Sequence, residues 1–145
     1  MDYEINPHIG IGPVKLGMNR EEVKEALGAE NYSGSNGEID YYFNNSFQIE
    51  FEENKADFIG ISYHPNYTVT YNGVNVFDTK AKQLFELIAL NEIEKHEYDS
   101  SEYLFPYQIV TLWDADEQYD QISSQSRIIW AQIGIGTQSY LQAVS

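Results

Sequence analysis

The chain has 145 residues, of which 42% are hydrophobic and 14% aromatic, and it contains no cysteine. These values fit one globular domain and exclude disulfides, a thiolate metal site and a cysteine nucleophile. With 23 acidic and 8 basic residues the formal net charge is −15, which argues against nucleic-acid binding because phosphates would be repelled. The charge favours a cationic partner, although solubility alone also accounts for an acidic chain.

The first predicted helix lies within residues 16–28. Asn19 is a suitable N-cap, Glu22 three positions later completes a capping box, and Gly28 can end the helix. One face of this segment is apolar, and it consists of Val23, Ala26 and Leu27. Because this stripe is narrow, we expect a short helix that buries only one side.

A polar loop follows at residues 29–38, and three strands are predicted after it, at 39–44, 46–53 and 57–63. In the second strand Phe47, Ile49 and Phe51 alternate with polar residues. Alternation of this kind predicts one buried face and one solvent-facing side that carries the carboxylates of Glu50 and Glu52. By the same rule Phe58 lies on the side of the sheet away from the core.

The second half begins with a predicted strand at 67–71, which the turn sequence Asn72-Gly73 ends. A second helix is predicted from about 79 to 91, with Asp78 or Thr79 as its cap. Its apolar stripe contains Ala81, Leu84, Phe85 and Ile88. Residues 92–102 then form a strongly acidic stretch.

The last predicted elements are strands at 103–114 and 127–135, which form a hairpin across a polar loop at 115–126. Pro106 should interrupt the first of them, since proline cannot donate to a strand ladder. In the second, Ile129, Ala131, Ile133 and Ile135 are assigned to the core. Alternation then places Ile128 and Trp130 on the opposite face.

The second half of the sequence resembles the first. A shift of 61 residues places Gly12 on Gly73 and Val23 on Leu84, and the elements follow the same order in both halves. A repeat of this length predicts a pseudo-symmetric body. We therefore predict an α+β fold in a single domain, 1–145. Two helix-plus-antiparallel-strand repeats, about 10–65 and 66–145, share one sheet with both helices on one face.

Patterns for catalysis, metal binding and cofactor binding are weak. The histidines His8, His64 and His96 lack metal-ligand spacing, and no Gly-x-Ser-x-Gly elbow is present. Residues 114–120 resemble a calcium loop but have tyrosine where the loop requires glycine. Gly134-x-Gly136 is not followed by a helix of the kind that holds a dinucleotide. We predict no catalytic residues, no metal and no cofactor.

A protein-binding surface is the better supported prediction. Phe58 and Trp130 would lie on the exposed sheet face beside carboxylates, and aromatic side chains and charges provide interface energy and complementarity. The predicted partner-binding residues are Phe58, Trp130, Glu50, Glu52, Asp114, Asp116 and Glu117. The alternative is that the two aromatics pack under a loop or form the seam between the repeats.

The segment Leu-Gly-Met-Asn-Arg-Glu-Glu-Val-Lys-Glu-Ala-Leu-Gly at 16–28 resembles a family motif. It is similar to the helix Gly-Met-(Ser/Thr)-x-x-(Glu/Gln)-Val-x-x-x-Leu-Gly of the β-lactamase-inhibitor-protein-like and small outer-membrane-assembly-lipoprotein group, with Asn19 in place of Ser or Thr. The resemblance implies tandem α/β repeats and a curved sheet. The lipidated cysteine of the lipoproteins is missing. In size and acidity the chain is also similar to immunity proteins of bacterial polymorphic toxin systems.

The function expected from these observations is that of a non-enzymatic, cytoplasmic protein-binding inhibitor. It would be an immunity protein that neutralises a basic toxin, for example a nuclease, by occlusion. The start of the sequence lacks the features of a signal peptide, and no apolar run is long enough to span a bilayer. The alternatives are a small-ligand-binding or enzymatic α+β domain, or an assembly module of a larger complex.

Overall fold

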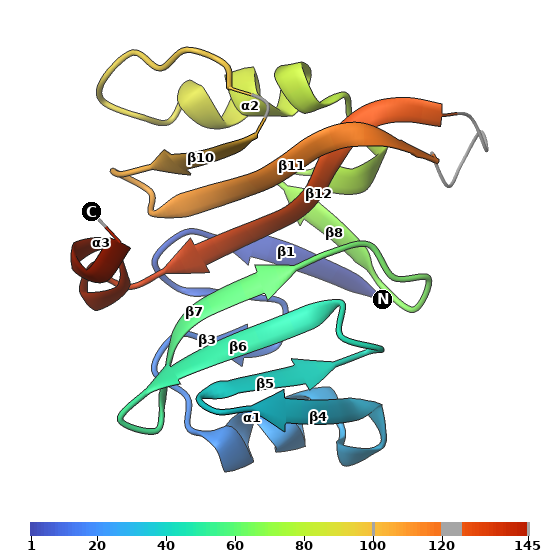
Figure 1. Cartoon of the computed structure of the whole chain (residues 1–145), viewed down its shortest axis with the longest axis vertical. Helices are drawn as coiled ribbons and strands as arrows, with labels where there is room; N and C mark the ends of the chain where they lie inside the picture. The colour runs from blue at the N-terminus through green and yellow to red at the C-terminus, as the bar shows by residue number, and fades with distance from the viewer. Residues whose placement is uncertain (100, 120–125, 145) are drawn as a thin grey trace.

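The computed structural model describes residues 1–99, 101–119 and 126–144 and has an α+β fold with two sheets (Figure 1). The elements of the first half are β1 (Asp2–Asn6), β2 (Gly10–Ile11), β3 (Val14–Lys15), α1 (Arg20–Leu27), η1 (Ala29–Asn31), β4 (Tyr32–Asn36), β5 (Ile39–Tyr42), β6 (Phe47–Glu52) and β7 (Lys55–Ile61). Those of the second half are β8 (Thr68–Tyr71), β9 (Val74–Asn75), η2 (Val76–Asp78), α2 (Ala81–Ala89), β10 (Glu102–Phe105), β11 (Val110–Tyr119), β12 (Ser126–Gly136) and α3 (Gln138–Val144).

The larger sheet has seven strands in the order β10-β11-β12-β7-β6-β5-β4, and every neighbouring pair is antiparallel. It therefore contains strands from both halves of the chain, which meet where β12 pairs with β7. In Figure 1, α1 lies towards the β4 end of this sheet and α2 lies towards the β10 end. Buried side chains of α1, α2 and the sheet belong to one hydrophobic core.

A second sheet was not predicted. It has five short strands in the order β3-β2-β1-β8-β9, with β1 antiparallel to β2 and parallel to β8. The predicted strand at 67–71 is confirmed as β8 and belongs to this sheet, so the prediction of one sheet was incomplete. Strands of two residues, such as β2 and β3, are too short to show an alternating pattern.

The local signals for the first helix are confirmed. The Asn19 side chain accepts a hydrogen bond from the Glu22 amide at 2.9 Å, and the Glu22 carboxylate accepts one from the Asn19 amide at 3.0 Å. Gly28, with φ of 91°, follows the last helical residue, as a C-terminal glycine often does. Val23 and Leu27 are buried.

The polar loop predicted at 29–38 is wrong, because this segment contains the edge strand β4. Its residues are Tyr-Ser-Gly-Ser-Asn, and none of them is buried. Neither alternation nor β propensity marks such a strand. It forms because β5 offers free backbone groups, with which Ser35 and Asn36 pair opposite Asp40 and Ile39.

The second helix is present with the predicted buried stripe of Ala81, Leu84, Phe85 and Ile88, but its predicted cap is wrong. The N-cap is Lys80, which makes no side-chain capping bond. Thr79 instead donates from its hydroxyl to the Asn75 carbonyl at 2.6 Å and closes the turn of η2. The competing local hydrogen bond therefore removes the residue from the capping role.

The acidic stretch predicted at 92–102 has a buried member. The Glu92 side chain is 1% exposed, and its carboxylate accepts hydrogen bonds from the backbone amides of Tyr107 and Gln108 at 3.0 and 2.9 Å. Its Oε1 also lies 3.5 Å from Nε2 of His96. This carboxylate joins the segment after α2 to the turn between β10 and β11. As predicted, Pro106 interrupts the strand expected at 103–114, but the two pieces are separate strands, β10 and β11, which pair antiparallel with each other.

The prediction that residues 115–126 form a loop is wrong over 115–119, because β11 continues to Tyr119 and pairs with β12 as far as Ser126. The face assigned to Trp130 is also wrong. Trp130 is fully buried, and its indole nitrogen donates to the Ala81 carbonyl of α2 at 2.9 Å. Trp130 and Ile133 are three residues apart, yet both belong to the core.

A local irregularity of the backbone lies on β11 opposite this part of β12. The ladder pairs Trp113 with Gln132 and Ala115 with Trp130, and Asp114 between them has a left-handed φ of 49°. Its amide donates to the Ser101 carbonyl at 2.7 Å instead of following the β11–β12 ladder. The pairing register is the same on both sides of Asp114, so neither strand contains an inserted residue. Trp130 is buried because α2, to whose Ala81 carbonyl it donates, and Tyr98 pack against it.

Candidate partner-binding groove

A groove of about 670 Å³ lies on the face of the seven-stranded sheet away from the core. The charged lining residues are Glu50, Asp99 and Glu102, and the aromatic ones are Phe58, Tyr103, Trp113 and Tyr140. We call this feature the outer groove. No Lys or Arg among the described residues lines it. Glu50 is on β6, as its alternation predicted, whereas Asp99, Glu102, Trp113 and Tyr140 come from the second half of the chain.

The floor of the outer groove includes Phe58, which is on the predicted face but only 4% exposed. Its ring stacks on Tyr140 of α3, with ring centroids 4.5 Å apart. A Cβ atom at Gly134 would lie 2.4 Å from this ring, and one at Gly60 would lie 3.0 Å from it. Phe58 therefore lies flat over two strand glycines and under α3, and it cannot be an exposed anchor for a partner.

The helix α3 had no predicted counterpart. Thr137, just before it, accepts a hydrogen bond on its hydroxyl from the Tyr140 amide at 3.2 Å, and its own amide donates to the Asp57 carbonyl at 3.0 Å. The Thr137 hydroxyl also donates to the Asp57 carboxylate. These bonds and the ring of Tyr140 hold α3 against the outer face of β7 and β12, where it forms one wall of the groove.

The carboxylates of the outer groove form no ion pair with any described residue. Burial, followed by the nearby Asp57, raises the pKa of Glu50. Burial, together with Glu50, Asp57 and Glu102, raises the pKa of Tyr140 to about 12. The ion pairs found among the described residues are Arg20–Asp40 and His96–Glu92, and neither includes a groove carboxylate.

The remaining predicted residues are not brought into the groove. Glu52 is exposed at the end of β6 and pairs in register with Lys55. Asp114 is exposed and does not line the groove. Asp116 and Glu117 lie on β11, but their side chains are outside the described part of the structure. Trp130 is in the core. The predicted site is thus reduced to Glu50 and the covered Phe58.

The residue that sequence reasoning missed is Trp113, which is 45% exposed at the groove. A signal for it existed, since Val110 and Leu112 alternate with Thr111 and Trp113 and the first two are buried. Tyr140 had no such signal, because its position depends on how α3 docks. Asp99 and Glu102 belong to the acidic stretch that the sequence did reveal.

The raised pKa of Glu50 gives a prediction for stability. The native state binds this proton more tightly than the unfolded state, whose glutamate pKa is about 4.3. The stabilising contribution is full below the unfolded pKa and is lost as pH rises through the folded pKa. Glu50→Gln should therefore melt at a higher temperature than wild type near about pH 7, and this margin should vanish below about pH 4.

Thermal denaturation followed by circular dichroism across this pH range measures the effect. Glu52→Gln is the matched control, since it alters an exposed carboxylate on the same strand. It should change the melting temperature little at any pH. A margin for Glu50→Gln that stays the same from acid to neutral pH would contradict the burial of a charge at this site.

Within residues 1–99, 101–119 and 126–144, no three His, Asp or Glu side chains are arranged to hold a metal ion. Of the residues in the calcium-like sequence, Asp114 and Asp116 lie on β11 and Asp120 is outside the described residues. No helix in the described part of the chain combines the length and the apolar character needed to cross a membrane.

Comparison with known proteins adds no family to this description. The resemblances to β-lactamase-inhibitor-protein-like repeats and to immunity proteins stay predictions that rest on the sequence. No protein-family model matches the chain, and no curated protein or solved structure is significantly similar to it.

Proposed function

We propose that this chain is a cytoplasmic immunity protein that binds a basic toxin, for example a nuclease, and neutralises it by occlusion. The observation that carries the proposal is the outer groove, in which carboxylates of Glu50, Asp99 and Glu102 face solvent without a lysine or arginine beside them. Charged groups of one sign in a concave surface attract a partner of the opposite sign and raise its association rate.

The groove is suited to a lysine or arginine side chain of the partner. Trp113 offers an exposed indole face, and cations bind such faces within about 6 Å of the ring centre. The carboxylates supply acceptors for the same cation. Partial burial disfavours the charged form of Glu50, as its raised pKa shows, and this opposes folding at neutral pH. Carboxylates whose pKa is perturbed in this way are often found at functional sites.

The proposal includes the internal duplication. Two features of the topology support it. The five-stranded sheet places the hairpins β2–β3 and β8–β9 on either side of β1, and β2 and β8 run antiparallel to each other. In the larger sheet the last strands of the two halves, β7 and β12, are also antiparallel neighbours. A pseudo-two-fold axis that passes through β1 and between β7 and β12 accounts for both arrangements.

The partner is to be sought by affinity capture from source cells, and the variants then test the groove. Trp113→Ala should weaken binding of a basic partner by about 2 kcal/mol, mainly through faster dissociation. Glu102→Lys should chiefly slow association, by a factor that shrinks as salt is added. Surface plasmon resonance at several salt concentrations measures both effects. The captured protein should be toxic when expressed alone and harmless when co-expressed with wild type.

Matched controls separate the groove from the general charge of the protein. Glu25→Lys makes the same charge change on the exposed side of α1, and Tyr107→Ala removes an exposed aromatic side chain outside the groove. Both should leave binding and protection close to wild type. A partner whose binding is equally sensitive to Glu25→Lys, or unaffected by both groove variants, would contradict the proposal.

A further inference from the structure

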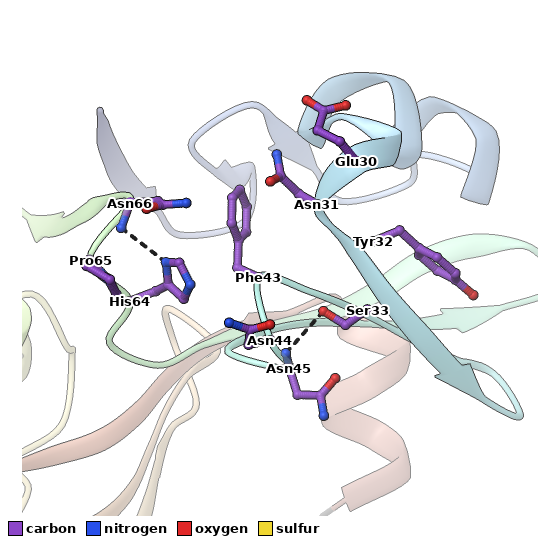
Figure 2. A pocket seen from close by; sticks show the side chains of 10 residues that line it. All are labelled: Glu30, Asn31, Tyr32, Ser33, Phe43, Asn44, Asn45, His64, Pro65 and Asn66. Atoms are coloured by element: carbon purple, nitrogen blue, oxygen red, sulfur yellow. Dashed lines mark hydrogen bonds between the residues drawn. The ribbon is translucent and has the colours of Figure 1, made fainter.

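A second cavity, of about 680 Å³, lies away from the outer groove and shares no lining residue with it. It is formed by η1 and β4, by the turn between β5 and β6, and by the segment after β7 (Figure 2). Its polar lining residues include Asn31, Asn44, Asn45, Asn66, His64 and Glu30. We call it the asparagine cavity.

The turn at this cavity has an unfavourable backbone. Phe43, Asn44 and Asn45 have φ of 53°, 55° and 69°, and left-handed residues other than glycine cost roughly 1 kcal/mol each. The turn is held by the buried Phe43, whose amide donates to the Asn31 carbonyl at 2.8 Å and whose carbonyl accepts from the Ser46 hydroxyl at 2.7 Å. A two-residue Asn-Gly turn would close such a hairpin without this cost.

The polar groups of the cavity retain hydrogen-bonding capacity. Nδ1 of His64 accepts from the Asn66 amide at 3.1 Å, so Nε2 carries the ring proton and is a free donor (Figure 2). Asn31 donates to the Leu27 carbonyl at 2.8 Å and keeps its own carbonyl oxygen free. The side-chain amides of Asn44, Asn45 and Asn66 make no hydrogen bond to any residue that the structure describes. Each can donate and accept at once.

Charge restricts the ligand. Among the residues that the structure describes, Glu30 is the one acidic residue of the lining and no Lys or Arg lines the cavity. The whole chain has a net charge of −15. Phosphate and carboxylate ligands would therefore be repelled. The side-chain amides surround a hollow and are not arranged along a strand edge. An extended peptide would need such a row of partners, because it presents one residue about every 3.4 Å. Neighbouring hydroxyls of a sugar match side-chain amides, which both donate and accept.

We propose that the asparagine cavity binds a neutral carbohydrate, with the amides of Asn44, Asn45 and Asn66 and Nε2 of His64 contacting its hydroxyl or acetamido groups. An anionic ligand is excluded, because no Lys or Arg among the described lining residues would neutralise it. This inference is independent of the immunity function, since the two sites have no lining residue in common.

The test is a nitrogen-15 NMR titration of the full chain with glucose, galactose, mannose, N-acetylglucosamine and their β-1,4-linked disaccharides. At least one should cause saturable shifts of the backbone amides around Asn44, Asn45 and His64. Asn44→Gly and Asn45→Gly remove the side-chain amides while glycine accepts the left-handed backbone. Each should lower the affinity about three- to tenfold, the effect of one lost hydrogen bond.

Asn72→Gly is the matched control, because Asn72 also has a positive φ, of 48°, but lies in the turn between β8 and β9 outside the cavity. It should bind like wild type. The proposal is overturned if none of the saccharides produces saturable shifts, if Asn72→Gly weakens binding as much as Asn44→Gly does, or if an uncharged Gly-Ser peptide binds at the cavity and no saccharide does.

Discussion

Replacing Trp130 with alanine is expected to lower the free energy of unfolding by about 3–5 kcal/mol, the usual range for a buried tryptophan. Trp130 is among the largest fully buried side chains, and it contacts α2 through its hydrogen bond to the Ala81 carbonyl. The substitution leaves a cavity between β12 and α2 and removes the hydrogen bond between the indole and the Ala81 carbonyl. Because domains of this size are stable by about 5–15 kcal/mol, a large fraction of the molecules could unfold.

Urea denaturation followed by far-ultraviolet circular dichroism measures this effect without relying on indole fluorescence. The chain provides its own control in Trp113, the other of its two tryptophans, which is 45% exposed. Trp113→Ala should change stability by no more than about 0.5 kcal/mol, as surface substitutions do. Similar losses for both variants would contradict the assignment of Trp130 to the core and of Trp113 to the surface.

Gly134→Ala is expected to destabilise the protein by about 2 kcal/mol. The added Cβ would lie 2.4 Å from Cζ of Phe58 and 2.9 Å from the Thr111 hydroxyl. Phe58 cannot move outward, because Tyr140 stacks on its other side. The strain must therefore displace either the Phe58 ring or α3. Because α3 forms one wall of the outer groove, we expect this wall to be held less firmly in the variant.

A double-mutant cycle isolates this overlap. Phe58→Ala removes the ring and leaves only the contact with Thr111, so adding Gly134→Ala to that variant should cost much less than it does in wild type, which gives a coupling of at least about 1 kcal/mol between the two positions. Urea denaturation of the four proteins supplies the numbers. If the two losses were simply additive, the ring would not lie over Gly134, and the position of α3 would need a different explanation.

The sequence predicted the candidate site only in part. Alternation along β6 placed Glu50 on the outer face correctly, because the pairing with β7 is regular from Phe47 to Glu50. The same rule failed for Trp130, because α2 and Tyr98 pack against this side chain and bury it. Trp113 replaced it as the exposed aromatic. The packing of α2 on β12 decides this outcome, and a rule that follows one strand cannot include it.

The sequence by itself determined the features that depend on neighbours along the chain. These are the capping box of α1, the buried stripes of α1 and α2, the strands β5, β6 and β7, and the end of β10 before Pro106. The hydrogen bonds and the hydrophobic patterns of these elements involve residues only a few positions apart, so the local sequence is enough to specify them.

The tertiary structure decided what depends on contacts between distant segments. Pairing with β5 makes the polar segment 32–36 a strand, and the position of β1 between β2 and β8 creates the second sheet. Docking of Tyr140 on Phe58 turns a predicted binding residue into the floor of a groove. In each case the free energy comes from burial and hydrogen bonding between residues far apart in the chain, and local sequence patterns do not contain it.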